Sequence, residues 1–314
     1  MKFVKSPLNY TGNKYRILDQ IYPHFPKNKT NMIDLFCGGA TVGVNSDFHK
    51  ITFIDHNPIV INLIRFLIKF DIENLISELS KLTDLYGLSN SYMNSYSIYK
   101  DDSNKSNPNN GLKKYNEKGY YALRKDYNSL ENKLSDRANI MLYLLMLYAF
   151  NNDLRFNSKG HFNLPVGKTD LNMVNVNKLQ AFKDKVAEKI TNFVTGDFRD
   201  PELQKILFSA DFIYMDPPYL ITEAFYNKSS RWDEKTEIQF VNFLDVLIDH
   251  NIEFVLSNIL SKGSLENHIL FDWIKSKDDT IKVVDINYHY RSSSYNKKNR
   301  NLKEREVIVV YKND

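Results

Sequence analysis

Short apolar segments alternate with longer segments of helical spacing, and this alternation limits the fold more than any other feature. Residues 31–36, 51–54, 193–195, 212–215 and 252–256 are apolar runs of strand length. Residues 58–70 begin with a proline and are typical of a helix. Between the last two runs, Phe240, Phe243, Leu244, Leu247 and Ile248 recur at helical spacing. Strands separated by helices predict a doubly wound α/β sheet.

The segment from residue 71 to residue 190 has a different pattern, without runs typical of parallel strands. A stretch rich in Ser, Asn and Tyr, residues 89–119, predicts a mobile loop, although its tyrosines could also stack on bases. Helical patterns follow over residues 120–134 and 138–150, and then a polar loop over 151–169. We therefore expect a sheet domain made of residues 1–70 and 191–314, interrupted by a mainly helical subdomain over 71–190.

Composition sets the outer limits. An apolar fraction of 42% over 314 residues is that of a globular protein. The single Cys37 excludes a disulfide framework, and no Cys/His cluster has the spacing of a metal site, so no metal is expected. The longest apolar run, residues 141–150, is too short to span a bilayer, and no signal peptide is apparent, which predicts a cytoplasmic protein. A net charge of +4 requires any nucleic-acid surface to come from local clusters.

The most informative residues for chemistry are Asp216, Pro217, Pro218 and Tyr219, which follow the apolar run 212–215. A carboxylate and a backbone carbonyl held by two prolines are suited to accept both hydrogens of an exocyclic amine. The aromatic ring after them offers a surface on which a planar base can stack. This pattern favours methylation of a nucleobase amine. The alternative is a proline-stiffened turn at a strand end.

A ligand site is predicted at the first strand, because ligands of doubly wound sheets bind at the carboxyl ends of strands. Asp34 lies in that strand, and the glycines after it, Gly38 and Gly39, allow close approach of a ligand. Asp55 ends the second strand about twenty residues later, where a ribose-binding carboxylate belongs. The full Gly-x-Gly-x-x-Gly pattern is absent, so a nucleoside carrying an amino acid fits better than NAD. A tight strand-to-helix turn is the alternative.

Residues 7–15 (PLNYTGNKY), residues 32–39 (MIDLFCGG), Ile54-Asp55 and the Asp-Pro-Pro-Tyr motif occur in an order that resembles the Dam-type DNA adenine-N6 methyltransferases. These belong to the D12 class, alpha group, with a target-recognition segment before Asp-Pro-Pro-Tyr. The resemblance implies a Rossmann-like methyltransferase sheet, S-adenosylmethionine as cofactor, and a flipped adenine within a short duplex sequence as target. It also implies a cofactor-binding set: Tyr10, Lys14, Asp34, Phe36, Cys37, Gly38, Gly39, Asp55 and Asp216.

Within that set Tyr10 would act through its ring and Lys14 through its charge. The family often has Trp at the position of Tyr10, so this residue is a mild departure. Asp197 and Phe198 follow the strand at 193–195 and are predicted to contact the adenine of the cofactor. The alternative for Asp197 is a helix N-cap before Pro201. Ser257 and Asn258, after the next strand, are candidates to line the pocket for the target base.

The loop over residues 151–168 combines amide, cationic and aromatic side chains and resembles the recognition hairpin of the Dam group. It has the Arg-x-Asn core and the Gly-x-Phe-Asn-x-Pro-x-Gly tail of that hairpin. Asn and Arg read base edges, and Lys positions phosphates. A second basic and aromatic patch lies at 288–300. The predicted DNA-binding residues are Asn152, Arg155, Asn157, Lys159, Lys168, Arg291, Lys297 and Lys298. A plain polar hairpin and solvated charge are the alternatives.

Two other functions stay open at this point. The chain could be a DNA-binding module whose methyltransferase fold has lost activity, or an enzyme of the same fold that acts on RNA or on cytosine N4. The expected partner is double-stranded DNA, with a restriction endonuclease of the same site as a further candidate, and a monomer is expected. GATC is the default site of the family, but residues 153–157 depart from the commonest Dam form. The recognition sequence therefore stays open.

Overall fold

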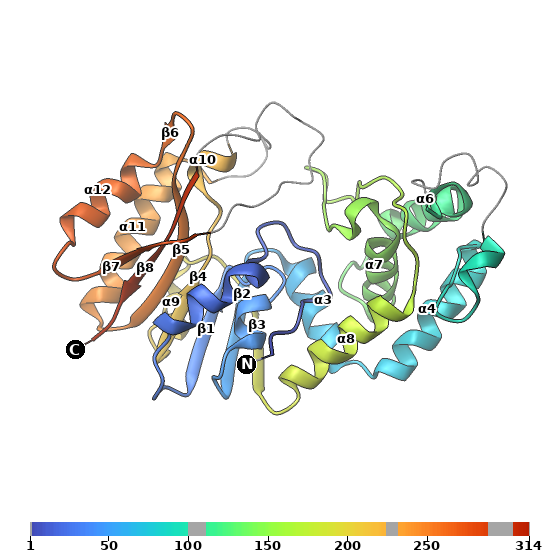
Figure 1. Cartoon of the computed structure of the whole chain (residues 1–314), viewed down its shortest axis with the longest axis horizontal. Helices are drawn as coiled ribbons and strands as arrows, with labels where there is room; N and C mark the ends of the chain where they lie inside the picture. Colours follow the sequence, from blue (N-terminus) through green and yellow to red (C-terminus); the bar gives the residue numbers. More distant parts are fainter. Residues whose placement is uncertain (1, 100–110, 224–231, 288–303, 314) are drawn as a thin grey trace. The chain divides into compact units, whose positions relative to one another are not determined.

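The computed structural model describes residues 2–99, 111–223, 232–287 and 304–313 (Figure 1). Contacts divide the chain into two compact units. Unit 1 comprises Met1–Tyr15, Gly38–Asn45 and Asn57–Glu188, and unit 2 comprises Arg16–Cys37, Ser46–His56 and Lys189–Asp314. The predicted inserted subdomain, residues 71–190, falls almost wholly in unit 1, which also takes in the N-terminal residues and the helix after the second strand.

Unit 2 is built on an eight-stranded sheet in the order β3-β2-β1-β4-β5-β8-β7, with β6 paired to β5. The first five strands of this order run parallel to one another, and β8 lies antiparallel to β5 and β7. The strand order reverses beside β1, with β2 and β3 on one side of it and β4 and β5 on the other. This is the doubly wound arrangement that the sequence predicted. The strands are β1 (Asn31–Leu35), β2 (Lys50–Asp55), β3 (Ile190–Thr195), β4 (Phe212–Met215), β5 (Glu253–Lys262), β6 (Leu265–Glu266), β7 (Lys282–Asp285) and β8 (Glu304–Tyr311).

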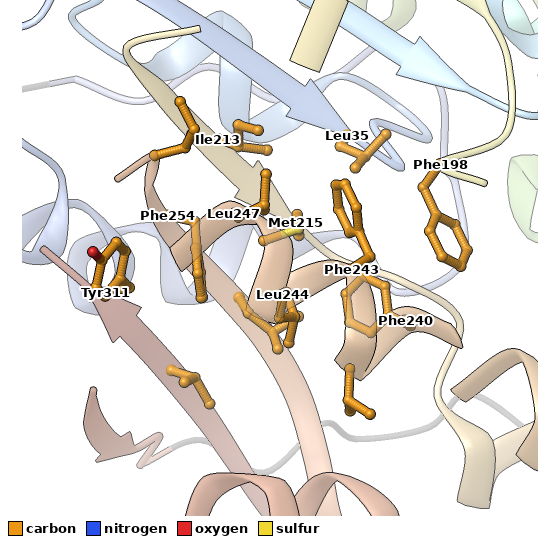
Figure 2. Close-up of a cluster of buried hydrophobic side chains, with 14 of the residues drawn as sticks. Leu35, Phe198, Ile213, Met215, Phe240, Phe243, Leu244, Leu247, Phe254 and Tyr311 are labelled. Carbon is orange, nitrogen blue, oxygen red and sulfur yellow. The ribbon is translucent and has the colours of Figure 1, made fainter. Parts of the chain in front are cut away.

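One face of this sheet carries the main core of unit 2. Helix α11 (Glu234–Asp249) buries Phe240, Phe243, Leu244 and Leu247 against strand residues such as Ile213, Met215 and Phe254 (Figure 2). Helices α9 (Pro201–Leu207) and α12 (His268–Ser276) contribute to the same cluster. The helical spacing seen in the sequence is therefore the core face of α11.

The opposite face is covered within unit 2 by α1 (Leu18–Ile21) and the 3-10 helix η2 (Tyr22–His24). The ring of Phe25, just after η2, lies 4.6 Å from that of Phe212 and 5.8 Å from that of Tyr214. Phe48 stacks on Phe212 at 5.4 Å. Both faces of β4 are thus buried, as a central parallel strand requires.

Unit 1 is mainly helical. Its elements are η1 (Lys14–Ile17, shared with unit 2), α2 (Thr41–Asn45), α3 (Pro58–Lys69), α4 (Ile72–Tyr86), η3 (Tyr96–Tyr99), α6 (Lys113–Ser129), α7 (Asp136–Tyr148), η5 (Phe150–Asn152) and α8 (Met173–Val186). The short helix α10 (Leu220–Glu223) belongs to unit 2. Helix α3 confirms the predicted helix, with the Asn57 side chain capping its first N–H groups and Pro58 at its start. Among the helices of the described segments, none is both long and apolar enough to cross a membrane.

The first and last long helices of unit 1 are joined at one end by a lysine. The ammonium of Lys183, on α8, donates to the carbonyl oxygens of Leu67, Ile68 and Phe70 at distances of 3.2, 2.6 and 2.8 Å. These are carbonyls at the C-terminus of α3, which lack partners within their own helix. Lys183 therefore satisfies them and neutralises the negative end of the α3 dipole.

The prediction of a mobile loop over 89–119 is wrong for its described parts. Ser89 and Asn90 are buried, and the Asp170 carboxylate accepts from the hydroxyls of Ser89 and Ser91 at 3.0 and 2.7 Å. Helix α6 begins at Lys113, and a Cβ at Gly119 would lie 2.1 Å from the Tyr86 carbonyl oxygen. Polar side chains here build a hydrogen-bonded interior, which a composition argument misses.

Candidate active site

Four neighbouring parallel strands end at one edge of the sheet of unit 2, and polar or aromatic residues follow there. Leu35 of β1 pairs with Ile54 of β2 and with Met215 of β4, and Asp55 pairs with Thr195 of β3. The register therefore brings the residues after these strands to the same edge, where ligands of such sheets bind. We call this set the carboxyl rim: Asp34, Phe36, Asp55, Asp197, Asp216 and Tyr219.

The loop after β1 has an unusual backbone. Phe36, Gly38 and Ala40 have φ angles of 64°, 46° and 57°, and the residues between them do not share this conformation. A non-glycine residue at positive φ costs free energy, and such strain concentrates at functional sites. The Cys37 N–H donates to the Ile54 carbonyl at 3.0 Å, which fastens the loop to β2. Burial, with Asp55 and Asp34 nearby, raises the pKa of the Cys37 thiol, so the thiol keeps its proton.

Within unit 1, the ring of Tyr10 lies directly against Gly38. A Cβ at Gly38 would be 2.7 Å from Cδ1 of Tyr10, and one at Gly39 would be 3.2 Å from the Ser6 hydroxyl. No other amino acid fits at Gly38 without displacing the tyrosine. Two residues that the resemblance assigned separately to the cofactor therefore lie in contact. Lys14 is buried, and its ammonium donates to the Gly12 carbonyl at 3.0 Å.

Two buried carboxylates lie at the ends of β1 and β2. Asp34 and Asp55 are only 2% and 5% exposed. His56 places its Nδ1 atom 3.2 Å from the Asp55 carboxylate. Charged side chains are seldom buried unless they are paired or hydrogen bonded. These two carboxylates of unit 2 can accept hydrogen bonds from a ligand that offers hydroxyl and amino donors, such as a nucleoside carrying an amino acid.

The Asp-Pro-Pro-Tyr motif follows β4 as predicted, and two of its residues are hydrogen bonded to each other. The Tyr219 hydroxyl donates to Oδ1 of Asp216 at 2.7 Å. Burial raises the pKa of Tyr219, and the carboxylates of Asp216 and Glu306 add to this effect, so the hydroxyl keeps its proton. The hydrogen bond fixes the orientation of the Asp216 carboxylate before any substrate is bound.

Behind this motif, Tyr214 and Ser257 share a hydrogen bond of 2.9 Å between their hydroxyl oxygens. Ser257 and Asn258 are both fully buried in β5, and Glu306 is buried in β8. Ser257 thus supports β4 beneath the motif, and lining of a base pocket by Ser257 and Asn258 stays a prediction. Glu306 was missed by the sequence reasoning, because the apolar run of β8 begins only after it.

The alternative reading of Asp197 as a helix cap is wrong. The N-cap of α9 is Asp200, whose side chain accepts from the Glu202 N–H at 2.9 Å. Asp197 instead pairs with Arg199 through two hydrogen bonds of 2.8 and 2.6 Å, and this lowers the pKa of its carboxyl. Phe198 is 3% exposed, and its ring lies 5.9 Å from that of Phe36. It also lies 5.6 Å from the ring of Phe243 (Figure 2). Contact of either residue with the cofactor stays a prediction.

Residues 151–168 of unit 1 form a hairpin-like loop held by two isolated bridges. We call this loop the recognition hairpin. Phe156 pairs with Phe162, and Ala149 pairs with Val166. The Asn128 side chain on α6 both donates to the Phe162 carbonyl and accepts from its N–H, at 3.0 and 2.9 Å. Phe162 is buried. The base of the hairpin is therefore fixed to α6 rather than solvated.

Two predicted base readers of the hairpin have structural roles. The Asn152 amide donates to the Leu147 carbonyl and the Thr169 hydroxyl, and the Asn157 side chain accepts from the N–H groups of Lys159 and His161. These bonds close the turns of the hairpin. Base contact by either amide stays a prediction, but it would have to be shared with these bonds.

The three predicted cations of the hairpin, Arg155, Lys159 and Lys168, are exposed. Nε of Arg155 donates to Oδ1 of Asn163 at 2.9 Å, which orients the guanidinium from behind. Arg291, Lys297 and Lys298 lie outside the described residues. Across the described segments, no three His, Cys, Asp or Glu side chains gather as metal ligands.

The N-terminal segment also reaches the hairpin within unit 1. Asn9 forms a bridge with Asp153, and its side chain donates to the Asn151 carbonyl and accepts from Lys178, each at 3.0 Å. Burial, with Lys5 nearby, lowers the pKa of Lys178 to about 8. Sequence reasoning missed Asn9, and its place next to Tyr10 was the only signal.

Comparison with known proteins agrees with this geometry. Residues 10–290 match the family model of the D12 class N6 adenine-specific DNA methyltransferases. The chain is 34% identical to modification methylase StsI of Streptococcus sanguinis and 32% identical to the type II methyltransferase M.FokI of Planomicrobium okeanokoites. These alignments cover 98% and 99% of this chain but only 43% of each relative.

A third relative is a DNA adenine methylase of Haemophilus influenzae, 29% identical over 68% of this chain and 63% of that protein. The chain thus spans less than half the length of the first two relatives. The family match, in contrast, covers most of the chain and includes the loop after β1 and the Asp-Pro-Pro-Tyr motif. The chain therefore belongs to the D12 class of N6 adenine-specific DNA methyltransferases.

Proposed function

We propose that this chain transfers a methyl group from S-adenosylmethionine to the N6 amine of an adenine that is rotated out of duplex DNA. The observation that carries the proposal is the Asp216 carboxylate at the end of β4, oriented by the Tyr219 hydroxyl at 2.7 Å. It lies at the same sheet edge as the strained loop after β1. The family membership and the names of the relatives support the same activity.

The cofactor would supply an electrophilic methyl group on a sulfonium. Asp34, Asp55 and the backbone of the loop after β1 are the proposed ligands in unit 2, and Tyr10, Lys14, Gly38 and Gly39 those in unit 1. Exclusion of any Cβ at Gly38 supports a role for this loop in close contact with a ligand. Asp55→Ala should weaken binding of the cofactor, and an unchanged dissociation constant by calorimetry would show that Asp55 faces elsewhere.

The residues of the chain would act on the target amine. An adenine N6 is a poor nucleophile because its lone pair is delocalised into the ring. Asp216 and the Pro217 carbonyl would accept its two hydrogens and aim the lone pair, and such positioning can lower a barrier by on the order of 7–11 kcal/mol. Rotating the base out of the stack costs a few kcal/mol, part of which stacking on Tyr219 would offset.

The proposed partner is double-stranded DNA, read by the recognition hairpin. Arg155 is the proposed base reader, and Lys159 and Lys168, with Arg291, Lys297 and Lys298, are proposed to contact phosphates. The names of two relatives, modification methylase and type II methyltransferase, support a place beside a restriction endonuclease. We further propose a monomeric enzyme, in the cytoplasm where such DNA would lie, with residues 71–190 as the recognition subdomain.

The test is direct. Plasmid DNA and total RNA from cells that lack their own DNA adenine methylase and express the chain would be digested to nucleosides and measured by mass spectrometry. N6-methyladenine, absent from cells that express Asp216→Ala, is the expected result. Methylation of cytosine N4 or of RNA instead would replace the proposed substrate, and cofactor binding without any methylated product would favour an inactive DNA-binding module. Sequencing of the modified positions would give the recognition site.

A further inference from the structure

Trp232 lies beside two rings predicted to be near the cofactor. Its ring is 5.6 Å from that of Phe36 and 5.8 Å from that of Phe198, and it also contacts Phe240 at 5.5 Å. Phe36 follows β1, Phe198 follows β3 and Trp232 precedes α11, so the three rings meet beside the carboxyl rim. All four residues belong to unit 2.

The exposure of these rings differs in an informative way. Phe198 and Phe240 are buried, whereas Trp232 and Phe36 are only partly buried. The cluster therefore rests on a closed aromatic base and presents part of two rings at the ligand-binding edge of the sheet. Aromatic surface at such an edge suits a planar ligand, because a base can stack on the exposed part of a ring.

The indole of Trp232 is held in place by a buried carboxylate. Its Nε1–H donates to Oε2 of Glu237, and the Asn267 amide donates to Oε1 of the same carboxylate at 2.6 Å. Asn267 is itself fixed, because its Oδ1 accepts from the Leu270 N–H at 3.1 Å and caps α12. With both donors turned toward it, Glu237 must accept with both oxygens.

This arrangement exceeds what packing alone requires. A tryptophan that only filled a core edge could leave its N–H to water at a partly exposed site. Here a fully buried glutamate and a helix-capping asparagine fix the plane of the ring. A ring held in one orientation loses little conformational entropy when a ligand stacks on it.

We propose that Trp232 forms an aromatic wall of the cofactor site and contacts the adenine of S-adenosylmethionine, and that Glu237 and Asn267 are positioning residues that fix its ring. This inference rests on the proposed function, and it names the purine as the part of the cofactor that is recognised here.

The sequence contains two tryptophans, Trp232 and Trp273, so fluorescence can locate the contact. Trp273→Phe leaves Trp232 as the only indole, and Trp232→Phe leaves Trp273, whose Nε1 donates to Asp245 at 2.8 Å. In Trp273→Phe, S-adenosylmethionine and adenosine should quench the emission, and methionine should not. In Trp232→Phe none of the three should change it.

Calorimetry on the same proteins separates this inference from the proposed function. If the wild-type protein binds S-adenosylmethionine but Trp273→Phe binds it without any change of emission, Trp232 is not in the site and the inference is wrong. If the wild-type protein does not bind the cofactor at all, the proposed function itself fails, and the inference fails with it. Quenching by methionine alone would also overturn the assignment to the purine.

Substitutions then test the role of each residue. Trp232→Ala should raise the dissociation constant of S-adenosylmethionine about tenfold, and Trp232→Phe about twofold, because a smaller ring remains. Glu237→Gln can accept only one of its two N–H donors, so affinity should fall about threefold and the emission of Trp232 should shift. The matched control is Asp245→Asn, which alters the acceptor of the other tryptophan and should leave cofactor affinity unchanged. An equal loss in both variants would reduce Glu237 to a structural role.

Discussion

In the carboxyl rim, polar side chains follow directly from hydrogen-bonded strands, whereas in the recognition hairpin polar side chains hold a backbone that has only isolated bridges. Asp55 and Asp216 are placed by the pairing of β2, β1 and β4. At the hairpin, Asn128 of α6 and Asn152 donate to main-chain carbonyls to give the loop its shape. The proposed chemistry thus rests on main-chain geometry, and the proposed reading of DNA rests on side chains that substitution can change.

The largest expected effect comes from removing the rim carboxylate. Asp216→Ala should lower methyl transfer by at least about 10³-fold, since the target amine loses its main acceptor. The fold should stay intact, because the side chain is partly exposed and supports no core. Turnover of S-adenosylmethionine on duplex DNA gives the rate, and a thermal melt checks the fold.

Tyr219→Phe is the matched variant, since it keeps the ring and removes only the hydroxyl that orients Asp216. It should reduce turnover about tenfold, between the wild type and Asp216→Ala. Near-wild-type turnover by folded Asp216→Ala would show that the carboxyl rim does not position the reacting amine. The proposed chemistry would then not rest on the strand geometry of the rim.

The next effect tests whether the backbone of the loop after β1 is as constrained as it looks. Gly38→Ala adds a methyl group 2.7 Å from the Tyr10 ring at a φ of +46°, so the free energy of unfolding should fall by about 2–3 kcal/mol. Gly12→Ala is the control, because Gly12 has a φ of +82° but open space around it.

Gly12→Ala should cost only about 1 kcal/mol, the price of backbone strain alone. Urea denaturation of both variants gives the two values. Equal losses in the free energy of unfolding would mean that Tyr10 moves aside freely. The close approach of Tyr10 to Gly38 would then not constrain the loop after β1.

A smaller effect is expected in the hairpin, and its pattern matters more than its size. Arg155→Ala should cost about 1–3 kcal/mol on the cognate sequence and relax preference at one base pair. Lys168→Ala should weaken binding to all sequences alike and lower the salt slope by about one. Binding would be measured on duplexes that differ by single base pairs, at two salt concentrations. A uniform loss for Arg155→Ala would move this residue from base reading to backbone contact.

The smallest effect is a difference in sign with pH. Arg199 lowers the pKa of Asp197 in the rim. Ionised Asp197 therefore stabilises the fold above its unfolded pKa, and this contribution is lost as pH falls through the lowered value. Burial raises the pKa of Asp153 in the hairpin, so stability is lost there as pH rises from the unfolded pKa through the raised value. Melting temperatures of Asp197→Asn and Asp153→Asn, compared with the wild type from pH 3 to 6, should diverge in opposite directions.

Much of the rim was predictable, because strand ends and motifs are local. The apolar run 212–215 coincides with β4, and Asp34, Asp55 and Asp216 lie at the sheet edge where their positions after strands put them. β8 and its Glu306 were not predicted, since an antiparallel partner of β5 depends on pairing between distant segments.

The hairpin shows the opposite limit. Its residue types pointed to DNA, yet the sequence could not show that Asn152 and Asn157 are engaged with the backbone while Arg155 is exposed. An amide side chain serves base edges and backbone groups equally well, so only the structure separates the two uses. Trp232 was missed for a related reason, because its significance depends on Glu237 and on rings from two other strand ends.

The lysine that joins α3 and α8 bears on how far the segment between β2 and β3 can vary. β2 and β3 are adjacent parallel strands, and residues 57–188 stand where a simple crossover would hold one helix. Lys183 links the last helix of this segment, α8, to its first helix, α3, so the two ends of the segment are held together by its own hydrogen bonds. Because this segment is closed by its own contacts, its hairpin can vary in sequence without altering the register of β2 and β3.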